Sequence, residues 1–238
     1  MHIVITGASR GIGKAIATLF AEKGYALYLT SKTESALQKT AEELAGSYPD
    51  LVIRAKAFDL GEAAQAKAFG AWVLAQGILP DVLVNNAGTF QPGNISDEPA
   101  GTLESQIAAN LYSAYHVTRS LLPAMMKPVA QPSPARHIFN MCSIASLDAY
   151  PNGGAYSISK FALHGFSKNL REEMKPHGIK VTAVFPGAVL TDSWGDFDNS
   201  SNRIMLPEDI AQLIYAATQL SPQACVEDIV IRPQLGDL

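Results

Sequence analysis

Residues 6–13 read Thr-Gly-Ala-Ser-Arg-Gly-Ile-Gly and join a short apolar run, His2–Thr6, to an amphipathic segment, Ile12–Lys23. Glycines allow a tight turn there and let backbone approach a ligand, while a helix N-terminus offers free N–H groups and a partial positive charge. A ligand-free glycine turn is the alternative interpretation. We favour a loop that cradles the pyrophosphate of a dinucleotide, with contacts at Gly7, Ser9, Arg10, Gly11, Ile12 and Gly13.

Outward from this loop, short β-branched runs alternate with longer amphipathic segments. The expected strands are His2–Thr6, Ala26–Thr30, Val52–Ala55, Val82–Val84, His137–Met141, Lys180–Val184 and Asp228–Ile231. The expected helices are Ile12–Lys23, Glu34–Ala45, Ala63–Gln76, Leu103–Met126, Ala155–Lys175 and Pro207–Leu220. This alternation predicts an α/β fold with a parallel sheet covered by helices on both faces, in one domain over residues 1–238.

The composition narrows the class of protein. Of 238 residues, 47% are hydrophobic and 17% are charged, which suits a packed core and excludes disorder. A formal net charge of −4 disfavours nucleic-acid binding and a polybasic membrane anchor. Cys142 and Cys225 fit neither a zinc site nor a disulfide framework, so we expect no metal and a reducing environment. With no signal-peptide pattern and no apolar run of about 18 residues, we expect a cytoplasmic protein without a membrane segment.

Two polar stretches interrupt the alternation. Lys127–Ala135 contains three prolines and predicts a surface loop. Thr191–Arg203 is polar and irregular apart from Trp194 and Phe197, and loops of this length in compact domains are often functional. We therefore expect a substrate lid at about residues 188–206.

The end of the second strand indicates which dinucleotide binds. NAD sites place an acid about 20 residues beyond the glycine loop, on the ribose 2′-hydroxyl. Here that position holds Ser31, followed by Lys32, and Arg10 lies in the loop itself. A hydroxyl flanked by cations suits a 2′-phosphate, although Lys32 as a solvated cation and nearby Glu34 weaken the argument. We expect NADP(H).

Tyr156 and Lys160 lie four residues apart in an expected helix and so share one face. A nearby ammonium, together with an oxidised nicotinamide, favours the phenolate and should lower the tyrosine pKa toward neutrality. Ser143 follows the strand that ends at Met141, at the sheet edge where α/β folds bind ligands.

Together with the glycine loop, these residues form an ordered set. It continues with Asn85-Asn86-Ala87-Gly88, Asn110, the 13-residue spacing of Ser143 and Tyr156, and Pro186-Gly187-x-Val189-x-Thr191. In this respect the chain resembles the short-chain dehydrogenase/reductase family over essentially its whole length. The resemblance implies a doubly wound Rossmann domain with seven parallel strands in the order 3-2-1-4-5-6-7.

The resemblance also implies residue roles. Tyr156 gives a proton to a carbonyl oxygen, Lys160 binds the nicotinamide ribose, Ser143 polarises the carbonyl, and Asn110 positions a water. The other implied cofactor contacts are Ser31, Lys32, Asp59, Leu60, Asn86, Ala87, Gly88, Pro186, Gly187, Val189 and Thr191. Plainer interpretations stay open: Asn110 as a helix kink, Asp59 as a turn acid, Asn86 as a brace of the fourth strand.

Three functions remain in competition. Trp194-Gly195 and the tail 231–238 resemble bacterial sepiapterin-reductase-like members, which favours an NADPH-dependent reductase of a ketone or diketone. The alternative is a 3-oxoacyl-carrier-protein reductase, disfavoured because Pro123 and Glu172 stand at two positions that are basic in those enzymes, although Arg119, Lys127 and Arg171 lie nearby. The third is a non-catalytic NADPH-binding regulatory protein. The resemblance further implies a homodimer or homotetramer built through the two long helices.

Overall fold

The computed structural model describes residues 1–128 and 135–237. Its strands are β1 (His2–Thr6), β2 (Ala26–Thr30), β3 (Ile53–Ala55), β4 (Val82–Asn85), β5 (His137–Met141), β6 (Lys180–Pro186) and β7 (Asp228–Ile231). Its α-helices are α1 (Gly11–Glu22), α2 (Glu34–Ser47), α3 (Ala63–Leu74), α4 (Thr102–Ile107), α5 (Ser113–Met125), α6 (Gly154–Met174) and α7 (Pro207–Thr218). The expected loop Lys127–Ala135 falls mostly on residues 129–134, outside the described residues.

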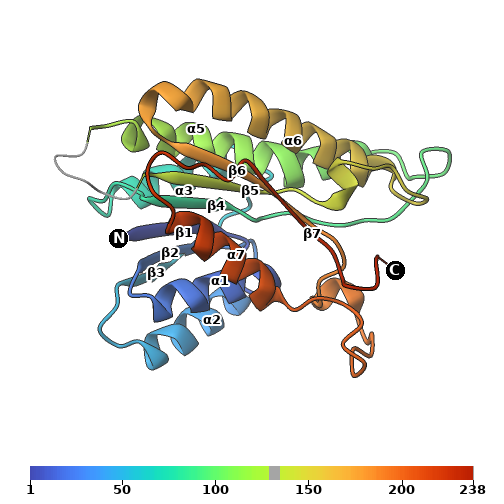
Figure 1. Cartoon of the computed structure of the whole chain (residues 1–238), viewed down its shortest axis with the longest axis horizontal. Helices are drawn as coiled ribbons and strands as arrows, with labels where there is room; N and C mark the ends of the chain where they lie inside the picture. The colour runs from blue at the N-terminus through green and yellow to red at the C-terminus, as the bar shows by residue number, and fades with distance from the viewer. Residues whose placement is uncertain (129–134, 238) are drawn as a thin grey trace.

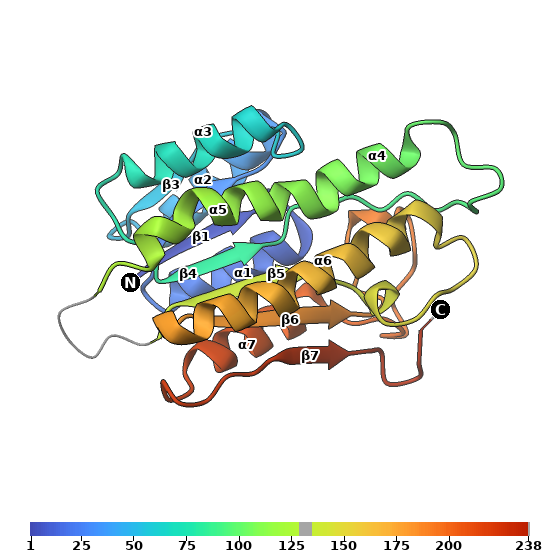
Figure 2. The same cartoon turned by 90° about the horizontal axis from the view of Figure 1, so that it is seen from above.

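The strands form one parallel sheet in the order β3-β2-β1-β4-β5-β6-β7, which confirms the expected fold. Helices α1, α2 and α7 cover one face, and α3, α5 and α6 cover the other (Figures 1 and 2). The chain starts at the centre, with β1 between β2 and β4, so the order reverses there. In α/β sheets ligands bind at the carboxyl edge beside such a reversal.

Both faces of the sheet are buried, which explains why the strands are continuously apolar. On β1, Ile3 and Ile5 pack into one core with Phe20 of α1, while Val4 points into the opposite core. The two cores clamp the central strands, so the loops at their carboxyl ends start from fixed positions.

The structure differs from the sequence-based prediction in the segment 103–126, which we expected to be one continuous helix. Instead α4 passes into a π-helical turn, Ala108–Tyr112, before α5 begins at Ser113. Asn110, a predicted site residue, lies in that turn. Such single π-turns inside helices occur frequently at functional sites, because they re-aim side chains and leave backbone groups free.

Among the described ranges, no helix has both the length and the apolar character needed to cross a membrane.

Candidate active site

The glycine loop is tightly packed against the strand edge. Gly7 and Gly11 have φ of +65° and +53°, in the left-handed region that favours glycine. A Cβ at Gly13 would overlap the carbonyl oxygen of Gly7, so only glycine lets α1 begin so close to the loop. The loop therefore forms the bare backbone cradle that a pyrophosphate requires.

Asn86 fastens this loop to β4. Its backbone N donates to Thr6 Oγ1 at 2.9 Å, and its Nδ2 donates to the carbonyls of Thr6 and Gly7, both at 3.1 Å. The N–H of Ala87 also donates to Thr6 Oγ1, at 2.9 Å. The bracing role of Asn86 is thus present, and Thr6 organises both loops, a role that its place at the strand end did not reveal.

The residues expected to contact the 2′-phosphate of NADP(H), Ser31 and Lys32, directly follow β2. Ser31 is buried, and its hydroxyl donates to the Thr33 carbonyl at 3.3 Å. Lys32 is exposed and pairs with Asp59 at 2.7 Å. Glu34, which weakened the argument for NADP(H), accepts a hydrogen bond from the backbone N of Ala57. Because an exposed ion pair contributes little, Lys32 can change partners at little cost.

Three other predicted cofactor contacts, Leu60, Arg10 and Ser9, have different surroundings. Leu60 is buried in the core that includes Phe69 rather than at the surface. Arg10 is exposed and pairs with Asp192 at 3.0 Å, linking the glycine loop to the lid. Ser9 offers its carbonyl to the Thr40 hydroxyl at 2.9 Å.

Helix α6 brings Tyr156 and Lys160 together. The amine of Lys160 lies 5.7 Å from the centre of the Tyr156 ring and donates to the carbonyl of Met141, at the end of β5, at 2.8 Å. Lys160 is 6% exposed. Burial lowers the pKa of Lys160 to about 8, because the surroundings penalise its charge.

Ser143 follows β5 and faces the same phenol. Its hydroxyl accepts from the Ala145 N–H at 3.2 Å, and Ser146 Oγ accepts from the Ser143 N–H, so a capping box fixes the turn. Burial raises the pKa of Tyr156, and the hydrogen bond from Ser143 partly opposes this shift. We expected Lys160 to lower the pKa of Tyr156. Among the chain's own groups, burial has the larger effect, and it raises this pKa instead.

Asn110 is buried at the base of the site. Its Oδ1 accepts from the Thr89 N–H at 2.8 Å, and its Nδ2 faces the Thr89 carbonyl, Gln106 Oε1 and Ser159 Oγ at 2.9–3.0 Å. A Cβ at Gly88 would lie 2.7 Å from Asn110 Oδ1 and 3.6 Å from Lys160 Nζ. Gly88, Asn110 and Lys160 therefore converge at one point.

A buried polar chain beneath the site links two strands to two helices. Asn85 Nδ2 donates to Asn140 Oδ1 at 2.8 Å and to Thr118 Oγ1 at 2.9 Å, and Asn140 Nδ2 donates to Ser167 Oγ at 2.9 Å. Sequence reasoning missed Asn140, although a polar residue inside an otherwise apolar strand is itself a signal. Buried amides need partners, so these bonds hold β4, β5, α5 and α6 in register.

The lid residues 188–206 leave the sheet beyond β6 and return to the body. Gly187 N donates to Ile231 O at 2.8 Å, and Val189 pairs with Met205 in a parallel bridge that closes the base of the lid. Within the lid, Trp194 and Phe197 pack on each other with ring centres 5.3 Å apart. Pro186 ends β6 immediately before this segment.

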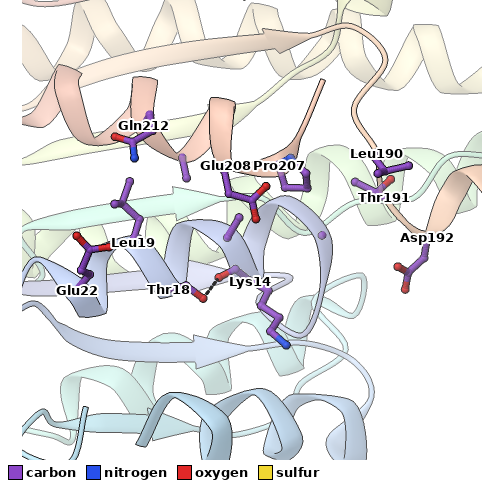
Figure 3. A pocket seen from close by; sticks show the side chains of 13 residues that line it. Lys14, Thr18, Leu19, Glu22, Leu190, Thr191, Asp192, Pro207, Glu208 and Gln212 are labelled. Atoms are coloured by element: carbon purple, nitrogen blue, oxygen red, sulfur yellow. Dashed lines mark hydrogen bonds between the residues drawn. The ribbon is translucent and has the colours of Figure 1, made fainter. Parts of the chain in front are cut away.

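A pocket of about 390 Å³ opens between α1, α7 and the start of the lid (Figure 3). It includes Gly11 and Thr191, two predicted cofactor contacts, but neither Tyr156 nor Lys160. A Cβ at Gly11 would lie 3.2 Å from Thr191 Cγ2, so the glycine loop and the lid touch here. The structure thus brings these two predicted cofactor contacts together.

Other reactive groups give no competing centre. Burial raises the pKa of the Cys142 thiol to about 11, so the thiol next to Ser143 is a poor nucleophile. Within residues 1–128 and 135–237, no group of three or more His, Cys, Asp or Glu side chains is placed to hold a metal ion. The arrangement of Tyr156 beside Lys160 can give and receive a proton through the Tyr156 hydroxyl.

The family model for short chain dehydrogenases matches residues 1–202. A sepiapterin reductase from Chlorobaculum tepidum is 30% identical over 99% of this chain and 97% of its own length. An uncharacterized oxidoreductase from Staphylococcus aureus is also 30% identical, over 97% and 96% of the two chains.

Two solved structures have the same fold. An alcohol dehydrogenase from Thermococcus sibiricus, complexed with 5-hydroxy-NADP, superposes with a TM-score of 0.89 at 26% identity, covering 98% of this chain and 96% of its own. A metagenomic short-chain oxidoreductase in complex with NADP has a TM-score of 0.82 at 30% identity, covering 98% and 97%. The family match over residues 1–202, on the sheet and site described above, shows that the chain belongs to the short-chain dehydrogenase family.

Proposed function

We propose that this protein is an NADP(H)-dependent reductase that converts a carbonyl group to an alcohol. The observation that carries the proposal is the convergence of Tyr156, Lys160 and Ser143 at the carboxyl edge of the sheet, with Asn110 at the base. A hydroxyl, an amine and a second hydroxyl meet there in a mostly buried setting, which suits proton transfer to an oxygen atom.

In this proposal the Tyr156 phenol gives its proton to the substrate oxygen while the Ser143 hydroxyl hydrogen-bonds the same oxygen. The protonated amine of Lys160 then stabilises the phenolate that remains. When bound, the nicotinamide supplies the hydride that the carbonyl carbon receives. Asn110 holds Thr89 through both its amide atoms and so keeps the wall beside Lys160 in place.

The glycine loop fits the cofactor, because its backbone cradle lacks the side chains that would block a pyrophosphate. Ser31 and Lys32 support NADP(H) over NAD(H): a carboxylate at position 31 would repel a 2′-phosphate, whereas a hydroxyl beside an exposed ammonium attracts it. The NADP ligand of the metagenomic relative agrees with this choice.

For the substrate we propose a planar ketone or diketone of the sepiapterin type. Support comes from the identity to the Chlorobaculum enzyme along the whole chain and from the aromatic pair Trp194 and Phe197 in the lid. Flat conjugated carbonyls stack on such rings more favourably than aliphatic chains do.

A carrier-protein-dependent reductase is less well supported. Docking an acidic carrier needs exposed cations on the long helices, but Arg171 is 7% exposed and binds the carbonyls of Val181 and Glu227. Arg119 and Lys127 are exposed, but Arg119 lies over the ring of Tyr115, 5.4 Å from its centre.

We also propose assembly into a homodimer or homotetramer through the α4–α6 surface. Several large apolar side chains on this surface are exposed in the single chain. They are Leu103, Tyr112, Tyr115, Ile158 and Phe161. Apolar groups of this size in one region mark interaction surfaces.

A panel of carbonyl substrates tests the proposed function. NADPH oxidation is followed at 340 nm, a wavelength set by the cofactor, with sepiapterin, diketones, acetoacetyl thioesters and aromatic aldehydes at equal concentration. We expect sepiapterin or a diketone to give the highest kcat/KM. Preference for the thioester by about a hundredfold would contradict the substrate assignment, and no oxidation with any carbonyl would contradict the reductase itself.

A further inference from the structure

An aromatic side chain that the family resemblance did not single out lies against the catalytic tyrosine. The ring of Phe90 meets that of Tyr156 edge-to-face, with centres 4.8 Å apart and planes at 82°. This contact has the geometry that aromatic pairs prefer. Phe90 is nevertheless 48% exposed, so the rest of its surface is available to a molecule that approaches the phenol.

A second aromatic residue, Tyr150, lies in the turn before α6, where its carbonyl accepts from Gly153 N at 3.1 Å. It is 39% exposed. Burial raises the pKa of Tyr150 to about 12, with a smaller contribution from Tyr156. Phe90 is thus the ring in edge-to-face contact with Tyr156.

The segment that carries Phe90 is fastened to the start of α6. Gly93 N donates to Asn152 O at 3.0 Å, Asn152 N donates to Asn94 Oδ1 at 3.2 Å, and Ala155 N donates to Glu98 Oε1 at 2.9 Å. We call these three bonds the latch. Its last bond caps α6 one residue before Tyr156, where a carboxylate also meets the positive end of the helix.

The backbone is shaped around this latch. Asn152 has φ of 61° and Gly154 has φ of +25°, so two of three consecutive residues leave the usual region. A Cβ at Gly154 would overlap both Glu98 Oε1 and the carbonyl of Gly93. The loop therefore lies directly on the turn that leads into α6, with no space for a side chain between them.

We propose, resting on the proposed reductase function, that Phe90 determines substrate specificity and that Glu98 is a positioning residue that holds Phe90 and Tyr156 in one arrangement. Phe90 presents an apolar face beside the reacting carbonyl. It therefore selects carbonyls that carry a flat aromatic or conjugated group over small aliphatic ones. Glu98 touches no reacting atom and acts only through the latch.

Two matched diketones test this proposal: 1-phenyl-1,2-propanedione and 2,3-butanedione. The quantity compared is the ratio of their kcat/KM values, phenyl over methyl, with NADPH saturating. We expect Phe90→Leu to lower this ratio about tenfold, the size typical of one lost apolar contact in a pocket. The dissociation constant of NADPH, measured by fluorescence, should change less than twofold, because Phe90 is assigned to the substrate alone.

Glu98 variants separate positioning from simple stability. Glu98→Ala should lower the same ratio about threefold to tenfold, whereas Glu98→Gln, which keeps an acceptor for the Ala155 N–H, should retain most of it. Asn94→Ala, which removes one bond of the latch, should act in the same direction with a smaller effect. Glu172→Ala is the matched control, because Glu172 is a carboxylate on α6 that pairs with Lys175 far from Tyr156, and it should leave the ratio unchanged.

The double variant Phe90→Leu/Glu98→Ala tests whether Glu98 acts through Phe90. If Glu98 acts through Phe90, the double variant should show the ratio of Phe90→Leu alone, a fully non-additive result. Independent, additive effects would overturn the positioning role, and an unchanged ratio in Phe90→Leu would overturn the specificity role. If the wild type reduces neither diketone nor any other carbonyl, the reductase proposal fails and this inference fails with it.

Discussion

The catalytic cluster and the lid differ in how they are held. Asn110 and Lys160 are almost fully buried, and each hydrogen-bonds to backbone carbonyls that the sheet or its loops fix in place. In the lid, by contrast, Asp192 and Arg203 make exposed contacts, to Arg10 and to the carbonyl of Gly236. The first region is organised by buried bonds, whereas these two lid contacts are exposed to solvent.

This contrast assigns different tasks to the two regions. Buried, fully bonded groups keep their geometry before substrate arrives, so they suit proton transfer, which requires fixed positions. Exposed pairs are weak and screened by salt, so residues 188–206 can rearrange at low cost, as the substrate lid expected there requires. In the proposed reductase, the buried cluster carries the chemistry and the lid adjusts to the ligand.

The substitution Tyr156→Phe should have the largest effect, and it tests whether the buried cluster is catalytic. It removes the proton donor while keeping the ring that packs against Phe90, so we expect kcat for carbonyl reduction to fall by about 10³-fold or more. NADPH affinity, measured by fluorescence titration, should change only severalfold. Substantial remaining turnover would show that the phenol is not the acid and that the buried cluster is structural.

Lys160→Met should have the next largest effect, about 10²-fold on kcat. The amine, whose pKa burial lowers to about 8, carries its proton below that pH and loses it above. Wild-type reduction should therefore be fastest below about pH 8 and decline as the pH rises through that value, because the charge that stabilises the phenolate disappears. The pH profile of kcat should lose this decline in the variant; an identical decline would assign it to another group.

Ser31→Asp should change cofactor preference rather than chemistry. A carboxylate facing a 2′-phosphate should raise the KM for NADPH about tenfold, equivalent to about 1.4 kcal/mol, and improve the use of NADH. Steady-state kinetics with both cofactors and one carbonyl measure this shift. Equal use of NADH by the wild type would already refute the assignment of Ser31 and Lys32.

Asp192→Asn should have the smallest effect. The pair with Arg10 is exposed, with 72% and 61% of the two side chains accessible, so its loss should cost less than about 1 kcal/mol of unfolding free energy. We expect kcat/KM to stay within about threefold of the wild type, in kinetic assays at low salt. A tenfold loss would mean that this one contact, rather than the lid as a whole, governs closure.

The fold was largely predictable because its signals are local. Each strand is a short apolar run and each helix an amphipathic one, and the spacing from Gly7 to Gly13 marks the first junction between them. The sequence left open a helix kink at Asn110 but did not predict the π-turn, because one added residue barely alters the amphipathic pattern.

The amino-acid sequence was enough to predict the alternation of strands and helices, the pairing of Tyr156 with Lys160 on one helix face, and the lack of an acid at position 31. The folded chain was needed to show that burial raises the pKa of Tyr156, that Lys32 pairs with Asp59, and that Glu98 binds the start of α6 near Phe90. This difference has a physical reason. Helix and strand preferences act between neighbours in the chain, whereas desolvation and long-range contacts depend on which distant segments the folded sheet brings together.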